Sequence, residues 1–195
     1  MIQFSETNEV VIKREYRAIL VGVAFDEAAI EASMEELSNL AEAAGCEVIG
    51  RMVQSAERRN GATLIGSGKV TELAELCEKM EADTVIFNEE LSGMQLRNLE
   101  EALKVRVVDR TILILDIFAS RAVSGEGKLQ VELAQLQYRL PRLSGFGKAL
   151  SRQGGGIGTR GPGEKKLETD RRHIERRIAD IKTELKRLSE TRSTQ

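Results

Sequence analysis

The spacing of apolar residues changes character near residue 122. Up to that point, short apolar runs alternate with stretches in which apolar residues recur every three or four positions. Uninterrupted runs are typical of strands covered on both faces, and the longer interval is typical of amphipathic helices. Strands are predicted at residues 16–23, 47–54, 63–66, 83–88 and 105–109, and helices at 27–44, 70–80, 92–103 and 111–122. This alternation predicts an α/β fold with a small, mostly parallel sheet and flanking helices.

The remaining residues have the pattern of two long helices. A leucine stripe predicts a helix over residues 128–140, which Pro141 is expected to stop. Apolar residues then return at heptad intervals, at Leu167, Ile174, Ile178, Ile181, Leu185 and Leu188. Two such helices joined by one loop predict a long antiparallel, coiled-coil-like α-helical hairpin. The expected organisation is an α/β domain over residues 1–122 and a hairpin over residues 123–195, with a tip loop at 143–166.

The predicted tip loop is rich in glycine. Residues 143–166 hold eight of the seventeen glycines of the chain and no acidic residue before Glu164. Such a segment cannot bury a core, because it has little apolar surface and each glycine adds backbone entropy that ordering must remove. Four cations lie in or beside it, at Arg142, Lys148, Arg152 and Arg160. We therefore expect either a flexible linker or a loop ordered by a polyanionic partner.

Charge is distributed unevenly along the chain. The net charge is −2, but residues 1–138 carry 14 Lys and Arg against 24 Asp and Glu, whereas residues 139–195 carry 15 against 7. The C-terminal part is basic and the preceding α/β part is acidic, which indicates that the hairpin is the part that meets a polyanion. RNA is the preferred partner, because glycines let backbone amides approach phosphates and arginines form forked contacts with them.

Other features of the sequence limit the classes of function. The first residues lack a basic region followed by an apolar block, and no apolar run is long enough to span a membrane, so a cytoplasmic protein is expected. Cys46 and Cys77 have neither zinc spacing nor a CxxC arrangement and are predicted to be small core residues. His173 has no partner in sequence for a triad or a metal and is predicted to lie on a solvated helix face. We predict no catalytic residues and no metal site.

One glycine turn is a candidate phosphate site. Gly66, Gly68 and Lys69 lie where a strand is predicted to lead into a helix, and backbone amides at such a position can hold phosphate. The P-loop pattern is not met, because Thr63 stands where its first glycine is required and Val70 follows the lysine. Two interpretations stay open, a tight structural turn and a nucleotide-binding α/β domain. A third alternative is a coiled-coil protein adaptor, since the heptads can also pair between chains.

Several segments in order resemble one protein family. They are IGSGKV at 65–70, QLRNLEEAL at 95–103, DRTILILDIFASRA at 109–122, GKLQVELAQLQYRLPRL at 127–143, SRQGGGIGTRGPGE at 151–164 and LETDRR at 167–172. Together they resemble the N-terminal part of the HflX GTPases, from about Ala18 to the end of the chain. In that family a GTPase domain follows the second long helix. The P-loop, the DxxG switch and the NKxD-type motif of that domain do not occur through Gln195.

The resemblance implies a role for this chain on the ribosome. It implies binding of the large ribosomal subunit and its rRNA, in a protein that rescues or splits stalled and stressed ribosomes. GTP and Mg²⁺ are implied only for the absent GTPase domain, so no cofactor and no enzymatic activity are expected of this chain, which is expected to be a monomer. The residues expected to contact rRNA are Arg142, Lys148, Ser151, Arg152, Gly154, Gly155, Gly156, Thr159, Arg160, Arg171 and Arg172.

Overall fold

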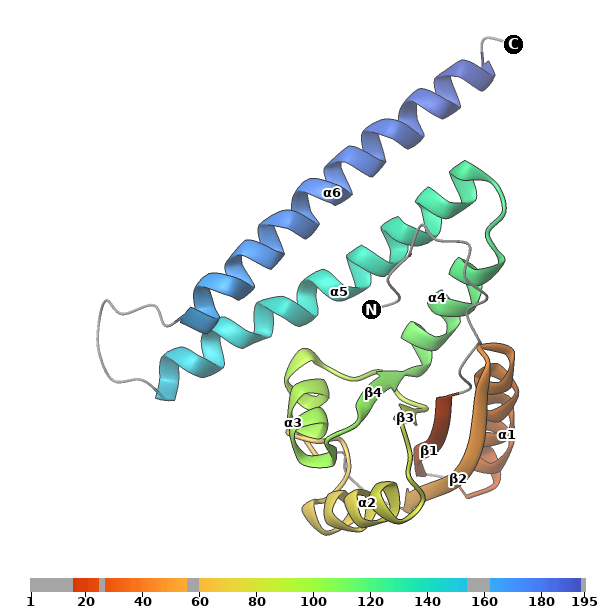
Figure 1. Ribbon diagram of the computed structural model, residues 1–195, viewed down its shortest axis with the longest axis vertical. Coiled ribbons are helices and arrows are strands. Elements are labelled where there is room, and N and C mark those ends of the chain that lie inside the picture. Colours follow the sequence, from red (N-terminus) through yellow and green to blue (C-terminus); the bar gives the residue numbers. More distant parts are fainter. Residues whose placement is uncertain (1–15, 25–26, 56–59, 154–161, 194–195) are drawn as a thin grey trace.

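A computed structural model describes residues 16–24, 27–55, 60–153 and 162–193 of the chain (Figure 1). Strands and helices alternate through the first part of the chain, and two long helices follow. The elements are β1 (Tyr16–Ala24), α1 (Glu27–Ala43), β2 (Cys46–Ser55), α2 (Ser67–Lys79), β3 (Thr84–Phe87), α3 (Gly93–Leu103), β4 (Arg106–Asp109), α4 (Arg110–Arg121), α5 (Gly125–Gln153) and α6 (Pro162–Ser193).

The four strands form one parallel sheet in the order β2-β1-β3-β4. Strand β1 is central and pairs with both β2 and β3, with Leu20 opposite Ile86 on one side and Arg51 on the other. From Ala18 onward β1 is buried throughout. The continuous apolar run in the sequence is thus explained by a strand covered on both faces, as parallel sheets with crossover helices require.

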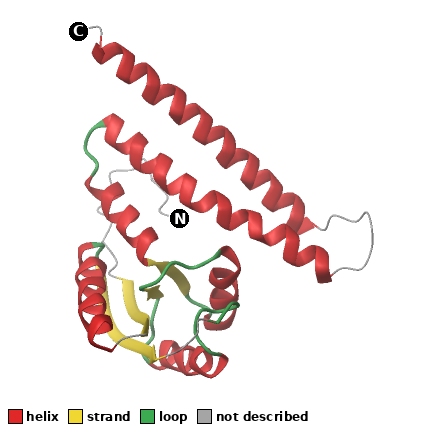
Figure 2. Ribbon diagram, turned by 180° about the vertical axis from the view of Figure 1, so that it is seen from behind, coloured by secondary structure: helices red, strands yellow, loops and turns green. Residues whose placement is uncertain are grey.

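Helices cover the sheet on both sides (Figure 2). Alternate residues of β1 point to opposite faces, so Ile19 and Val21 pack with α2 and α3 through Leu73 and Leu99. Leu20, in contrast, lies in the cluster formed with α1 and α4. The predicted α/β fold with a small parallel sheet and flanking helices is confirmed.

Polar residues fix the helix ends nearest the hairpin. Ser92 caps α3 in a capping box with Gln95, in which each side chain bonds to the backbone N–H of the other residue. Asp109 ends β4 and caps α4 by accepting the N–H of Ile112 at 3.0 Å. Gly45, predicted to stop the first helix, follows α1 with a φ of 82° that favours glycine. The caps at Ser92 and Asp109 fix the starts of α3 and α4, the two helices of the sheet domain that α5 contacts.

Helices α5 and α6 run antiparallel as a hairpin, with α5 between α6 on one side and α3 and α4 on the other (Figure 1). The apolar residues at heptad intervals form the seam of α6 against α5. Of these, Ile178 and Ile181 are 9% and 0% exposed, while Leu188 near the open end of the hairpin is 39% exposed. Arg177 of α6 donates two hydrogen bonds to the carboxylate of Glu132 on α5, both at 2.7 Å. The predicted hairpin is confirmed, and its seam is occupied within the chain.

Three boundary predictions are wrong. Pro141 does not stop its helix but lies inside α5, which continues to Gln153, because the tertiary contacts around it outweigh the lost backbone hydrogen bond. The predicted tip loop at 143–166 is correspondingly too long, since α6 begins at Pro162 and residues 154–161 lie outside the described part. Residues 63–66 form no strand; Asn60 and Leu64 share only an isolated bridge.

Candidate nucleic-acid interface

The outer face of α6 is basic. An α-helix turns about 100° per residue, so Arg172, Arg176 and Arg187 lie on the side of α6 opposite the seam residues Ile178 and Ile181. All three arginines are exposed, whereas both isoleucines are buried. The sequence pattern that buries one side of α6 in the hairpin therefore presents a row of cations on the other side.

Some of these cations hold carboxylates on their own helix. Arg171 pairs with Glu175 at 2.9 Å and Arg172 with Glu168 at 3.1 Å, each four residues away along α6. Exposed pairs of this kind are worth about 0.3 to 0.5 kcal/mol. Such a pair exchanges readily for a phosphate contact, so Arg171 and Arg172 remain available to a polyanion.

Other cations of α6 form no ion pair with the described carboxylates. Within the described ranges, no carboxylate forms an ion pair with Arg176, Lys182 or Arg187, and all three residues are exposed. Their charge is uncompensated by direct contacts. Arg176 and Arg187 extend the outer row along α6 beyond the pairs near its N-terminal end, whereas Lys182, four residues after Ile178, lies beside the buried side of the helix.

The tip residues predicted to contact RNA are only partly described. Lys148, Ser151 and Arg152 lie in the last turns of α5, where the backbone is helical. Gly154, Gly155, Gly156, Thr159 and Arg160 lie outside the described residues. Helix α5 therefore carries part of the expected loop to the far end of the hairpin, away from the sheet domain (Figure 1).

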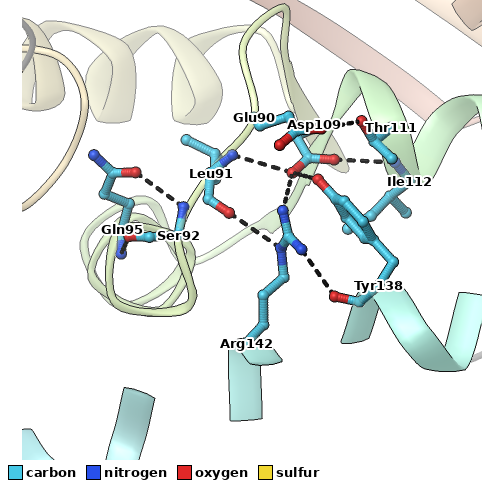
Figure 3. Close-up of polar contacts among 9 residues, drawn as sticks. All are labelled: Glu90, Leu91, Ser92, Gln95, Asp109, Thr111, Ile112, Tyr138 and Arg142. Atoms are coloured by element: carbon cyan, nitrogen blue, oxygen red, sulfur yellow. Dashed lines mark hydrogen bonds and ion pairs between the residues drawn. The ribbon is translucent and has the colours of Figure 1, made fainter. Parts of the chain in front are cut away.

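Arg142 lies against the sheet domain (Figure 3). Its guanidinium donates to the carbonyls of Leu91 at 3.1 Å and Tyr138 at 2.8 Å, and to the carboxylate of Asp109 at 3.4 Å. It also lies over the Tyr138 ring, 3.3 Å from the ring centroid. The side chain is 16% exposed, whereas Arg171 and Arg172 are exposed.

Asp109 is the centre of this cluster. Its side chain is fully buried and accepts hydrogen bonds from the backbone N–H of Leu91 at 3.1 Å and the hydroxyl of Tyr138 at 2.6 Å, besides the cap and Arg142. Burial and the hydrogen bond to this carboxylate raise the pKa of the Tyr138 hydroxyl above its ordinary value. The carboxylate stays buried because several donors replace water around it.

The roles of Asp109 and Tyr138, and a second polar link between α4 and α5, were not predicted from the sequence. In that link, the Gln135 amide donates to Asp116 at 3.0 Å. A signal was present, because Gln135, Tyr138 and Arg142 follow one another at intervals of three and four on the side of the helix opposite the leucine stripe. A polar stripe at helical spacing indicates a second buried face.

The candidate phosphate turn has internal partners. Gly66 precedes α2, and its N–H donates to the side chain of Gln54 at 2.9 Å, while the Lys69 ammonium pairs with Glu72 at 2.7 Å. A side chain at Gly68 would meet nothing within 4 Å, so that side of the turn is open. Phosphate binding by Gly66, Gly68 and Lys69 stays a prediction.

Other site types find little support in the described part of the chain. No group of three or more metal-ligating side chains occurs there, and none of its helices has the length and apolar content of a membrane span. His173 is exposed on α6, as predicted, and Cys77 is buried in the core while Cys46 is half-buried. The basic face of α6 and the buried cluster around Asp109 are the features that remain.

Comparison with known proteins identifies the family. Residues 31–119 match the family described as GTP-binding GTPase N-terminal, and residues 121–195 match the GTP-binding GTPase Middle Region. The chain is 59% identical over 169 residues to the GTPase HflX of Alkalihalophilus pseudofirmus, covering 86% of this chain and 40% of the relative. It belongs to the HflX GTPase family. The Escherichia coli GTPase HflX is 44% identical over 176 residues, covering 90% of this chain and 41% of the relative.

The chain corresponds to the N-terminal and middle regions of HflX and spans about 40% of the length of the curated relatives it matches. Among solved structures, a GTP-binding protein from the hyperthermophilic archaeon Sulfolobus solfataricus in complex with GDP is similar, with a TM-score of 0.62 and 25% identity. The likeness covers 89% of this chain and 46% of that one. The matched regions are those that precede the GTPase domain expected from the resemblance.

Proposed function

We propose that this chain is the region of an HflX-type GTPase that binds the large ribosomal subunit, with rRNA held along the outer face of α6 and at the tip of the hairpin. The observation that carries the proposal is the row of exposed arginines on the outer face of α6, of which Arg176 and Arg187 form no ion pair with the described carboxylates. Arginines and lysines that neutralise phosphates supply most of the affinity of such complexes.

The charge of the two parts supports this orientation. Residues 139–195, the greater part of the hairpin, carry 15 basic against 7 acidic residues, and the rest of the chain has the opposite balance. A polyanion is therefore attracted to the hairpin and repelled by the sheet domain, which favours an approach along the hairpin. Glycines at the tip would let the backbone approach RNA phosphates and sugars closely.

In this proposal the chain binds rRNA, and it does not hydrolyse nucleotide. GTP and Mg²⁺ belong to the GTPase domain of the longer family members, and release or splitting of stalled and stressed ribosomes would need that domain as well. Action on ribosomes places the protein in the cytoplasm. The seam residues Ile178 and Ile181 are buried within the hairpin, so they do not favour the alternative of a coiled-coil adaptor that pairs between chains.

Charge reversal on α6 tests the proposal. The variant carrying Arg176→Glu and Arg187→Glu should cosediment with purified large ribosomal subunits at least about tenfold more weakly than the wild type, because two phosphate contacts become repulsive. A matched control carries Arg97→Glu and Lys79→Glu in the sheet domain, where both cations lie outside the hairpin. Equal loss in both variants, or no loss in the α6 variant, contradicts the proposed surface.

A further inference from the structure

One face of α5 is bonded to the sheet domain through side chains at helical spacing. Gln135, Tyr138 and Arg142 lie at intervals of three and four residues and therefore share a face. The first donates to Asp116 of α4, and the other two donate to Asp109 at the end of β4. We call these five residues the joint, since they connect the arm to the base.

A glycine brings backbone against backbone at the same place. Gly93 begins α3, and a Cβ at this position would clash with the carbonyl oxygen of Arg142. The neighbouring carbonyl of Leu91 accepts from the Arg142 guanidinium (Figure 3). Only a residue without a side chain permits this approach, so α3 and α5 meet at a fixed point.

The joint also lies at the weakest point of α5. Pro141 cannot donate a backbone hydrogen bond, and proline in a helix interior is unfavourable. The next residue, Arg142, is the one held by Asp109, Leu91 and Tyr138. The contacts made directly after the proline are thus the same contacts that attach the arm to the base.

We infer that the joint sets the direction of the hairpin relative to the sheet domain, and that Tyr138 and Arg142 are positioning residues for the polyanion that the arm binds. The second half rests on the proposed function, and the first does not. Arg142 acts through Asp109, because its Nε, Nη1 and Nη2 atoms each donate within the protein and its side chain is only 16% exposed. These hydrogen bonds hold the arm by their geometry, so loss of the donors of Tyr138 and Arg142 frees it.

Distance measurement between spin labels tests the direction of the arm. Labels at Lys79→Cys in α2 and Thr183→Cys in α6 report the distance from the sheet domain to the arm. Labels at Gln130→Cys and Thr183→Cys report a distance within the arm. Both pairs are made in a background with Cys46→Ala and Cys77→Ala. All three label sites are exposed. The joint variant carries Tyr138→Phe and Arg142→Met. Its matched control carries Arg139→Met, which removes an exposed arginine of the same helix.

The expected result is a base-to-arm distribution that is narrow in the wild type and in Arg139→Met but broad in the joint variant, with the within-arm distribution unchanged. A narrow base-to-arm distribution at the wild-type distance in the joint variant overturns the inference. If the joint variant does not fold, Tyr138→Phe alone takes its place, because it removes a single hydroxyl and should broaden the distribution partially. The same unchanged narrow distribution in that variant overturns the inference as well.

Salt dependence of large-subunit binding separates positioning from contact. If the productive direction falls to about a tenth of the population, the joint variant binds about tenfold more weakly at every salt concentration. The slope of log affinity against log salt then equals that of the wild type, because no phosphate contact is lost. A slope shallower by about one identifies Arg142 as an RNA contact and overturns the positioning role. If the wild type does not bind subunits, the proposed function fails while the distance result still stands.

Discussion

At the scale of single residues, Asp109 shows how one side chain joins three elements. It ends β4, caps α4 and accepts donors from α5, and it is fully buried. The sequence placed Asp109 at a strand end but did not indicate its partners, because Tyr138 and Arg142 are about thirty residues away. Contacts between distant residues depend on how helices pack, which periodicity does not specify.

Alkaline pH should weaken the fold through Tyr138. The pKa of its hydroxyl is raised by burial and by the bond to Asp109, so the folded protein holds this proton more tightly than the unfolded chain. Stability contributed by the group is complete below about pH 10 and is lost as the pH rises above that value. The measurement is urea unfolding between about pH 9 and pH 11 for the wild type and Tyr138→Phe.

The phenylalanine variant should start less stable by about 1 to 3 kcal/mol, because Asp109 loses one donor. Its stability should then fall less steeply with pH than that of the wild type, since other titrating groups are common to both. Parallel pH curves would contradict this role for the Tyr138 hydroxyl.

At the scale of elements, apolar periodicity predicted the strands and helices well wherever burial on a face decides the structure. The run in β1 and the heptads of α6 are examples, and Ile178 and Ile181 are buried as their spacing predicts. It failed at Pro141 and at residues 63–66. At Pro141 tertiary contacts overrode the local preference to end the helix. At residues 63–66 an apolar run is buried without pairing into the sheet.

Truncation in the hairpin seam should depend on depth. Ile181→Ala removes a fully buried side chain and should lower the free energy of unfolding by about 2 to 5 kcal/mol, through lost transfer energy and the cavity left behind. Leu188→Ala is the matched control on the same seam, because Leu188 is 39% exposed and should cost less than half as much. Thermal and urea unfolding of both variants measure the difference, and equal costs would show that the seam does not pack as described.

The contact between α3 and α5 predicts different outcomes at two helical glycines. A methyl group at Gly93 would meet the Arg142 backbone, so Gly93→Ala should destabilise by about 1 to 3 kcal/mol through overpacking. A methyl group at Gly68 in α2 would meet nothing, so Gly68→Ala should be neutral or stabilising by up to about 1 kcal/mol. Chemical denaturation compares the two variants; a harmless Gly93→Ala is incompatible with the close approach of the helices.

At the scale of the whole molecule, an acidic α/β base carries a long basic arm. The charge asymmetry and the hairpin were both predictable from the sequence, since each depends on the order of residues along the chain. The side of the sheet domain on which the arm lies was not, because it depends on Asp109, Gly93 and the polar face of α5 together. Of the candidate RNA surface on α6, Arg172 was among the residues predicted to contact rRNA and Arg176 and Arg187 were not, while Arg142 belongs to the attachment of the arm.

The most direct test of ribosomal binding by the basic arm is the salt dependence of wild-type binding to purified large ribosomal subunits. Cosedimentation across a salt series should give a log affinity that falls linearly with log salt, as release of counterions from rRNA requires. The variant with Arg176→Glu and Arg187→Glu should show a slope shallower by about two, one for each lost phosphate contact. An affinity that does not change with salt, or a slope that is the same in the variant, would contradict binding of rRNA by the outer face of α6.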